Sequence, residues 1–213
     1  MSAINFKYGR AESMSRVLSI LEQQRSGGIK IVEVGVARGD GQEISNGHSS
    51  ILFAWYMQYH NKGNYFNQYI GIDISSKAIE YTQKHLKELK LSHPLRVSLV
   101  CMDAIKYFKE GHHEQAINSP IIDLLYLDGW DYEAGNNVQN KISEEATLEC
   151  LKAAEPFFDD RTMVLFDDVF NDIWHGKAKL AIPYLMDKGW IPAYERLDNQ
   201  VLMIQNCLAK CES

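Results

Sequence analysis

The sequence lacks the features of a nucleic-acid-binding or membrane protein. Its 22 Lys and Arg residues stand against 28 Asp and Glu residues, giving a net charge of −6, and the basic residues form no block. We therefore expect no phosphate-neutralising surface and no nucleic-acid partner. No run of 18 apolar residues occurs, and residues 1–17 contain no apolar segment of the kind a signal peptide carries. These absences predict a soluble cytoplasmic protein that does not bind a membrane.

Cysteine is also scarce, with only 4 residues in 213. Cys207 and Cys211 have no further Cys or His at the spacing of a zinc site. Cys101 and Cys150 lie in apolar segments and are predicted to be buried thiols. Nothing in this pattern indicates a disulfide framework, which agrees with a reducing compartment.

Strand-like and helix-like apolar patterns alternate along the chain. Expected strands are 29–34, 69–74, 96–101, 121–127 and 162–166, followed by a hairpin of 190–196 and 201–205. Expected helices are 11–25, 49–60, 76–90, 104–110, 143–154 (with Ser143 as N-cap) and 177–188. This order predicts an α/β fold with a doubly wound, Rossmann-like seven-stranded sheet, mostly parallel, with one antiparallel strand in the C-terminal hairpin. The length fits one domain, with 1–28 as an N-terminal helical cap, 29–206 as the core and 207–213 as a tail.

Acidic residues follow nearly every expected strand. Asp128 and Asp131 come after 121–127, and Asp167 and Asp168 come after 162–166. In an open parallel sheet, ligands bind beyond the carboxyl ends of the strands. The acids are therefore expected to line a ligand site.

The first strand leads into IVEVGVARGDG, which contains Glu33, Gly35 and Gly39. A dinucleotide-binding turn would read G-x-G-x-x-G, but Ala37 stands where the second glycine would be. A bound pyrophosphate is therefore disfavoured. An acid so close to the turn suits a cationic or hydroxyl-bearing ligand instead.

The next two strands end in Asp73 and Asp103. An acid at the tip of the second strand typically accepts hydrogen bonds from both ribose hydroxyls. Asp103 stands where an adenine amino group could donate. As an alternative, both residues could serve as helix N-caps, which strand-to-helix junctions often need.

Taken together, these motifs resemble those of class I S-adenosylmethionine-dependent methyltransferases. That family carries E-x-G-x-x-x-G, then an acid after the second strand, then Asp-Ala after the third, and the resemblance here runs from about Ile29 to Ile204. It implies S-adenosyl-L-methionine as cofactor. The cofactor-binding residues that it implies are Glu33, Gly35, Gly39, Asp73, Ile74, Asp103, Ala104 and Asp128.

The fourth and fifth strand ends resemble those of metal-dependent O-methyltransferases of the catechol and macrocin types. The Pro-Pro-aromatic motif common in methyltransferases that act on base amino groups is missing, because Gly129 and Trp130 follow Asp128. The resemblance implies Asp128, Asp167 and Asp168 as metal ligands. Independently of it, three carboxylates at adjacent strand tips would repel one another without a cation or protons, and oxygen ligands suit Mg²⁺. Such an ion would bind substrate hydroxyls and lower the pKa of the one to be methylated.

At the residue expected to take the hydroxyl proton, the sequence departs from the family pattern. The family often has Lys or His three positions after the first metal ligand, whereas this chain has Asp131. Asp131 and His175 are the candidate catalytic residues, with Lys177 or the metal alone as alternatives. Trp130 is expected either to form a wall of the site or to belong to the core. The adjacent His112 and His113 are expected to be exposed to solvent.

The sequence thus predicts an S-adenosylmethionine-dependent O-methyltransferase that acts on a hydroxyl of a small molecule, such as a sugar, a phenol or a natural product, with Mg²⁺ as a second cofactor. Two alternatives are a metal-dependent hydrolase on the same sheet and a protein that binds S-adenosylmethionine without catalysis. The identity of the acceptor is left open, as is the oligomeric state, for which a homodimer is one option.

Overall fold

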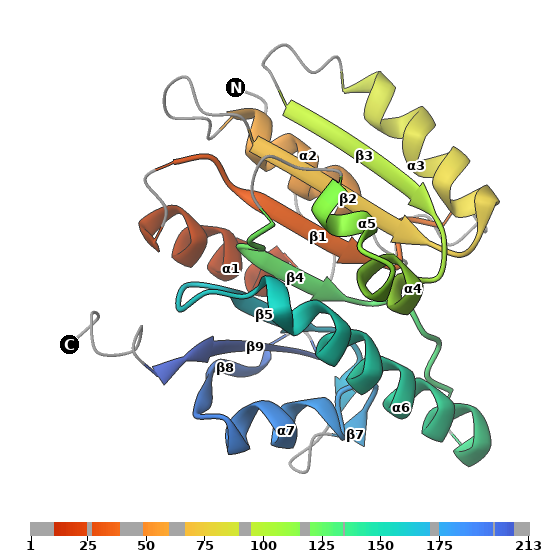
Figure 1. Ribbon diagram of the computed structural model, residues 1–213, viewed down its shortest axis with the longest axis vertical. Coiled ribbons are helices and arrows are strands. Elements are labelled where there is room, and N and C mark those ends of the chain that lie inside the picture. The colour runs from red at the N-terminus through yellow and green to blue at the C-terminus, as the bar shows by residue number, and fades with distance from the viewer. Residues whose placement is uncertain are drawn as a thin grey trace.

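The computed structural model describes residues 11–24, 27–38, 49–59, 67–89, 95–115, 120–133, 135–170, 175–197 and 199–206. Its centre is a seven-stranded sheet of order β3-β2-β1-β4-β5-β9-β8 (Figure 1). The strands are β1 (Lys30–Val34), β2 (Asn67–Asp73), β3 (Leu95–Cys101), β4 (Leu124–Leu127), β5 (Met163–Phe166), β8 (Trp190–Leu197) and β9 (Gln200–Gln205). Neighbours from β3 to β5 are parallel, whereas β9 is antiparallel to both β5 and β8. The predicted fold class is confirmed.

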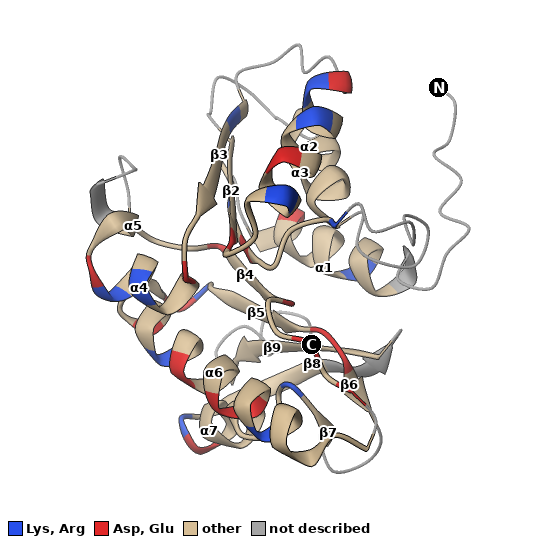
Figure 2. Cartoon of the chain, turned by 90° about the vertical axis from the view of Figure 1, so that its right-hand side faces the viewer, with Lys and Arg blue, Asp and Glu red and all other residues tan. Residues whose placement is uncertain are grey.

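Helices cover both faces of this sheet (Figure 2). One layer contains α1 (Ala11–Gln24), α2 (Ser49–Tyr59) and α3 (Ser76–Glu88); the other contains α4 (Ala104–Lys109), α5 (His112–Gln115), α6 (Asn137–Ala154) and α7 (Ala181–Asp187), with the 3₁₀ helix η1 (Glu155–Phe157) after α6. Successive strand residues point to opposite faces, so Ile31 and Tyr126 pack with α1 and α2, while Val32 and Leu125 pack with α4 and α6. Among the described helices, none is long and apolar enough to cross a membrane.

Several elements differ from the sequence-based prediction. Helix α6 begins at Asn137, capped by the Asn136 side chain, which accepts from the backbone N–H of Gln139. Ser143, predicted to be the cap, lies buried inside the helix. Helix α7 begins at Ala181 rather than at 177. The short strands β6 (Val169–Phe170) and β7 (His175–Gly176), which pair antiparallel, were not predicted.

Two burial predictions need correction. Cys101 is exposed, although Cys150 is buried as predicted. His113 is fully buried rather than exposed: its Nε2 lies 2.7 Å from the carbonyl oxygen of Pro120, and its ring centroid lies 4.6 Å from that of Phe157. Burial lowers the pKa of His113 to about 4. The helical turn α5 explains this, because it places the ring against Tyr107, Phe108 and Phe157.

Candidate active site

The candidate site lies where the strand order reverses, between β1 and β4. Ligands of doubly wound sheets bind in the crevice at such a point. The Asp128 N–H donates to the Val34 carbonyl over 2.8 Å, which fixes the turn after β4 against the end of β1. Gly35 has φ +85°, and a Cβ there would lie 2.6 Å from the Asp128 backbone. The close approach of the neighbouring turn is one structural reason for this glycine, and its predicted contact with the cofactor stays a prediction. Gly39, predicted to bind the cofactor, lies outside the described residues.

Glu33 is buried at the end of β1 among hydroxyl groups of the protein. Its side chain is fully buried and accepts hydrogen bonds from the hydroxyls of Ser49, Ser50 and Tyr69. The Ser50 hydroxyl in turn accepts from the Ala37 N–H at 3.1 Å. Glu33 therefore anchors the turn after β1 to the start of α2. The hydroxyls that contact this acid in the structure belong to the chain itself, and its predicted contact with the cofactor stays a prediction.

The protonation of Glu33 makes a testable contribution to stability. Burial raises the pKa of Glu33 to about 7, although the three hydroxyl hydrogen bonds act in the opposite direction. Because the pKa of Glu33 is raised in the folded state, the protein loses stability as pH rises from the pKa of the unfolded chain, 4.5, to that of the folded protein, about 7. The difference corresponds to roughly 3 kcal/mol.

We therefore expect Glu33→Gln to gain stability relative to the natural protein as pH rises. Urea unfolding of both proteins between about pH 5 and about pH 8 measures this, and the difference in unfolding free energy should change by roughly 3 kcal/mol across the range. His113 titrates in both proteins, so its contribution cancels in the difference. A constant difference across the range would contradict the prediction.

Asp73 and Ile74 form the end of β2 beside this turn. The Asp73 carboxylate accepts from the N–H of Val36 at 3.1 Å and from that of Ser75 at 2.8 Å. Asp73 is not the cap of α3, because the Ser75 hydroxyl accepts from the Ala78 N–H. A carboxylate offers about four acceptor positions, so two backbone donors leave room for ligand hydroxyls. The next side chain, Ile74, is 76% exposed and offers an apolar surface beside the carboxylate.

Asp103 and Ala104 begin α4 at the end of β3. The Asp103 side chain accepts from the Lys106 N–H at 2.9 Å, so the N-cap alternative is confirmed for this residue. Ala104 is buried beneath it. A carboxylate, an apolar side chain and a second carboxylate thus follow one another across the ends of β2 and β3. These are the side chains of the described residues that could hold the ribose and adenine of a nucleoside.

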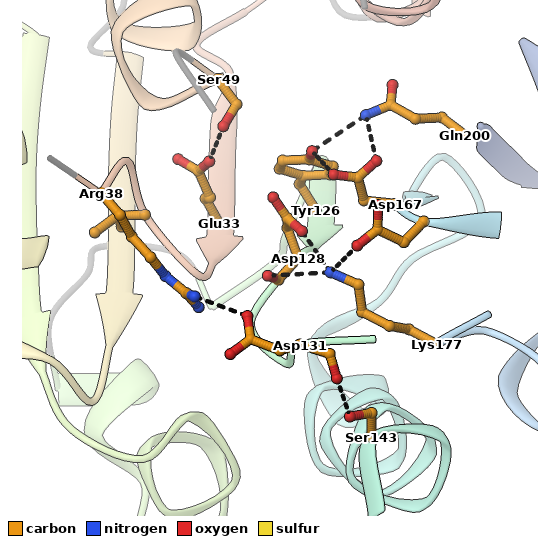
Figure 3. Close-up of polar contacts among 12 residues, drawn as sticks. Glu33, Arg38, Ser49, Tyr126, Asp128, Asp131, Ser143, Asp167, Lys177 and Gln200 are labelled. Carbon is orange, nitrogen blue, oxygen red and sulfur yellow. Dashed lines mark hydrogen bonds and ion pairs between the residues drawn. The ribbon is translucent and has the colours of Figure 1, made fainter. Parts of the chain in front are cut away.

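Arg38 and Asp131 form an ion pair between the turns after β1 and β4 (Figure 3), with 2.8 Å between Arg38 Nη1 and Asp131 Oδ1. The Asp131 side chain is 77% exposed. Burial lowers the pKa of Arg38, but Asp131, together with Asp73 and Asp128, more than offsets it and raises that pKa. Ser143 donates to the Asp131 backbone carbonyl at 2.6 Å, which holds the turn against α6. The predicted base Asp131 thus lies at the site but is engaged by an arginine.

The ends of β4 and β5 are joined by a lysine. Lys177 Nζ lies 2.6 Å from Asp128 Oδ1 and 2.9 Å from Asp168 Oδ2, and its side chain is only 3% exposed. Burial lowers the pKa of Lys177, but the charges of Asp128, Asp168 and Asp167 outweigh it and raise that pKa. The amine is therefore a charged ammonium between two carboxylates. The sequence suggested Lys177 as a base, a role that an ammonium cannot perform.

The Asp167 side chain is directed away from Lys177 and Asp128 (Figure 3). Its carboxylate is fully buried and accepts from the Tyr126 hydroxyl at 2.9 Å and from Gln200 Nε2 at 3.3 Å. The predicted convergence of Asp128, Asp167 and Asp168 on one Mg²⁺ ion does not agree with this arrangement. No group of three or more His, Cys, Asp or Glu side chains within the described ranges could hold a metal ion. The donor set present here does not fit the predicted magnesium site.

The two remaining candidate residues of the sequence analysis are His175 and Trp130. His175 is half-buried in β7, two positions before Lys177. Trp130 is partly buried and packs against the apolar cluster between the sheet and α4, α6 and α7, so the core alternative describes it. Arg38 was missed as a site residue, although its place in the glycine motif was a signal.

Comparison with known proteins supports the fold assignment. The sequence matches no protein-family model and no curated protein. Among solved structures, the chain is similar to apo CalS11, a TDP-rhamnose 3'-O-methyltransferase of calicheamicin biosynthesis (TM-score 0.58, 19% identity, 92% of this chain and 81% of that one). It is also similar to the SAH-bound methyltransferase PaMTH1 of Podospora anserina (0.56, 12%, 91% and 78%) and to a Clostridium thermocellum protein proposed to be an rRNA methylase (0.55, 16%, 90% and 95%). The protein therefore has the Rossmann-like fold of class I methyltransferases.

Proposed function

We propose that this protein is an S-adenosylmethionine-dependent O-methyltransferase acting on a hydroxyl group of a small molecule. One observation carries the proposal: Asp73, Asp103 and Asp128 stand at the carboxyl ends of the parallel strands β2, β3 and β4, on the two sides of the point where the strand order reverses. The order of these acids along the chain is that of the methyltransferase motifs. No hydrolase of the alternative kind would need the nucleoside half of this arrangement.

In the proposal, Asp73 binds the ribose hydroxyls, Ile74 packs on the adenine, and Asp103 lies near its amino group. Bound there, S-adenosylmethionine would supply a methyl group on a positively charged sulfur. Asp128 and Asp168 face the acceptor from β4 and β5. The task of the chain is then mainly to position the acceptor oxygen and to receive its proton, for which Asp131 and His175 are the candidates.

The acceptor is inferred from charge rather than from the fold. Proteins of this fold include an O-methyltransferase for a sugar nucleotide and a protein proposed to be an rRNA methylase. The net charge of −6 disfavours a polynucleotide acceptor. Acids grouped at the strand ends are better suited to hydroxyl donors than to phosphates. A small hydroxylated molecule is therefore the proposed acceptor.

Calorimetric titration with S-adenosylmethionine and with S-adenosylhomocysteine tests the proposal. We expect binding of one molecule per chain, followed by transfer of labelled methyl groups to members of a panel of sugars, phenols and polyols. No binding of either nucleoside would refute the proposal. Binding without transfer to any acceptor would favour the non-catalytic alternative. Asp131→Asn and His175→Gln identify the proton acceptor as the variant that loses transfer but keeps the affinity for cofactor.

Asp73→Asn tests the nucleoside site directly. The amide keeps the shape of the side chain but has a single oxygen, so it retains one of the two backbone hydrogen bonds and loses the charge that strengthens hydrogen bonds from ribose hydroxyls. We expect the dissociation constant of S-adenosylmethionine to rise about 10- to 100-fold. Asp187→Asn, an exposed acid at the end of α7, serves as the control and should bind normally. An unchanged affinity in Asp73→Asn would place the ribose elsewhere.

A further inference from the structure

The path of the backbone after β5 places Lys177 beside Asp128 and Asp168. After β5 the chain turns at Asp168, which has φ +51° although it is not glycine. Residues 169–170 then pair with 175–176 as the two-stranded sheet β6–β7. Gly176 has φ +123°, and a Cβ there would lie 1.8 Å from the Asp168 carbonyl oxygen. The residue after this close approach is Lys177, so backbone geometry brings its ammonium back beside Asp168.

Burial of a charged amine is costly unless its partners are fixed. Transferring an ammonium out of water costs several kcal/mol, which only close and well-directed opposite charges offset. Lys177 has two such partners, Asp128 on β4 and Asp168 after β5, and the Asp128 backbone carbonyl at 3.4 Å as a third acceptor. An ammonium has three N–H donors, and these three acceptors match them. The acceptors around Lys177 therefore form a specific binding site for its ammonium group.

The same place cannot hold this ammonium and a divalent ion together. Asp128 and Asp168 are two of the three ligands that the sequence predicts for Mg²⁺, and the ammonium engages an oxygen of each. The third predicted ligand, Asp167, is turned toward Tyr126 and Gln200. A divalent ion between Asp128 and Asp168 would face like charge at contact distance. The lysine and the metal are alternatives.

We propose that Lys177 is the resident cation of this site, holding Asp128 and Asp168 in place of a divalent ion, so that methyl transfer needs no added metal. The part that concerns methyl transfer rests on the proposed function, whereas the part that concerns cation binding does not. Lys177 acts as a positioning residue: its ammonium fixes one oxygen of each carboxylate. The side chains of Asp128 and Asp168 are 20% and 30% exposed, so part of each remains accessible from solvent.

The first test measures Mn²⁺ binding to the natural protein without any cofactor, by the loss of the free-ion paramagnetic resonance signal. We expect no stoichiometric binding at millimolar Mn²⁺. Lys177→Ala removes the charge and opens space between two carboxylates, and we expect it to bind Mn²⁺ at least about tenfold more tightly than the natural protein. The gain should vanish in Lys177→Ala/Asp168→Asn. Lys109→Ala, which breaks an exposed pair with Glu149, is the control and should not bind.

Two results would overturn the proposal. One is stoichiometric Mn²⁺ binding by the natural protein that is lost in Asp128→Asn. The other is a folded Lys177→Ala whose Mn²⁺ affinity equals that of the natural protein, because the lysine would then not occupy a cation position. If Lys177→Ala does not fold, the natural protein and Asp128→Asn still decide the question.

A second measurement separates this inference from the proposed function. S-adenosylmethionine binding and methyl transfer are compared in excess EDTA and in excess Mg²⁺. We expect equal transfer rates in both. Transfer that requires Mg²⁺ would refute the resident cation while leaving the methyltransferase proposal intact. Failure to bind S-adenosylmethionine would refute the proposed function, whereas the Mn²⁺ result would still stand for the cation site.

Discussion

Replacing Gly35 with alanine is expected to destabilise the protein by roughly 2–5 kcal/mol. Two costs combine at this position. The backbone has φ +85°, which an L side chain adopts only with strain, and the new Cβ would lie 2.6 Å from backbone atoms of Asp128 and Gly129. The obstacle is main chain rather than a flexible side chain, so the turn after β4 would have to move away. That movement would break the 2.8 Å hydrogen bond from the Asp128 N–H to Val34.

Gly189→Ala separates the two costs. Gly189 has the same φ of +85°, but nothing lies within 4 Å of the Cβ position. We expect it to lose only about 1–2 kcal/mol, the cost of the left-handed backbone alone. Urea unfolding of both variants gives the comparison, and the excess for Gly35→Ala measures the contact between the two turns. Equal losses would show that β1 and β4 do not meet as described. S-adenosylmethionine affinity should fall only in Gly35→Ala.

The fold was predictable because its signals are local and repeated. Strands such as 163–166 are short apolar runs, and the helices between them carry a 3.6-residue period, so the order of elements follows from the sequence. The first residue of each helix was harder to predict than the order of the elements. Ser143 resembles an N-cap, but Asn136 captures that role, and Ser143 instead binds the Asp131 carbonyl inside α6. Tertiary contacts of the whole turn determine which residue caps the helix, and the local sequence alone does not reveal those contacts.

The site was predictable in position but not in its charge arrangement. Parallel strands place Asp73, Asp103, Asp128 and Asp168 at one edge of the sheet, as the sequence indicates. The direction of each side chain depends on more distant partners: Asp167 is turned inward by Gln200, which lies 33 positions later. The cation Lys177 arrives through β6 and β7, and strands of two residues have no periodicity to detect. The need for a cation among the acids was nevertheless correct.

Lys177→Met is expected to lower the unfolding free energy by about 3–5 kcal/mol, the loss measured when one partner of a buried ion pair is removed. Methionine fills nearly the same volume, so the loss reports the charge rather than a cavity. Asp128 and Asp168 would then face each other without the ammonium that now lies 2.6 Å and 2.9 Å from them. Lys109→Met breaks a 2.5 Å pair whose side chains are 53% and 55% exposed, and it should lose no more than about 1 kcal/mol.

A double-mutant cycle with Asp168→Asn shows whether the three groups act as a unit. In Lys177→Met, two carboxylates have lost the ammonium between them, so removing one of the two negative charges should restore part of the stability. We expect Lys177→Met/Asp168→Asn to be more stable than the sum of the single changes predicts, by about 1–3 kcal/mol. Lys177→Arg keeps the charge and should lose less than Lys177→Met. Simple additivity would mean that Lys177 does not neutralise the acids of β4 and β5, and the resident-cation proposal would lose its energetic basis.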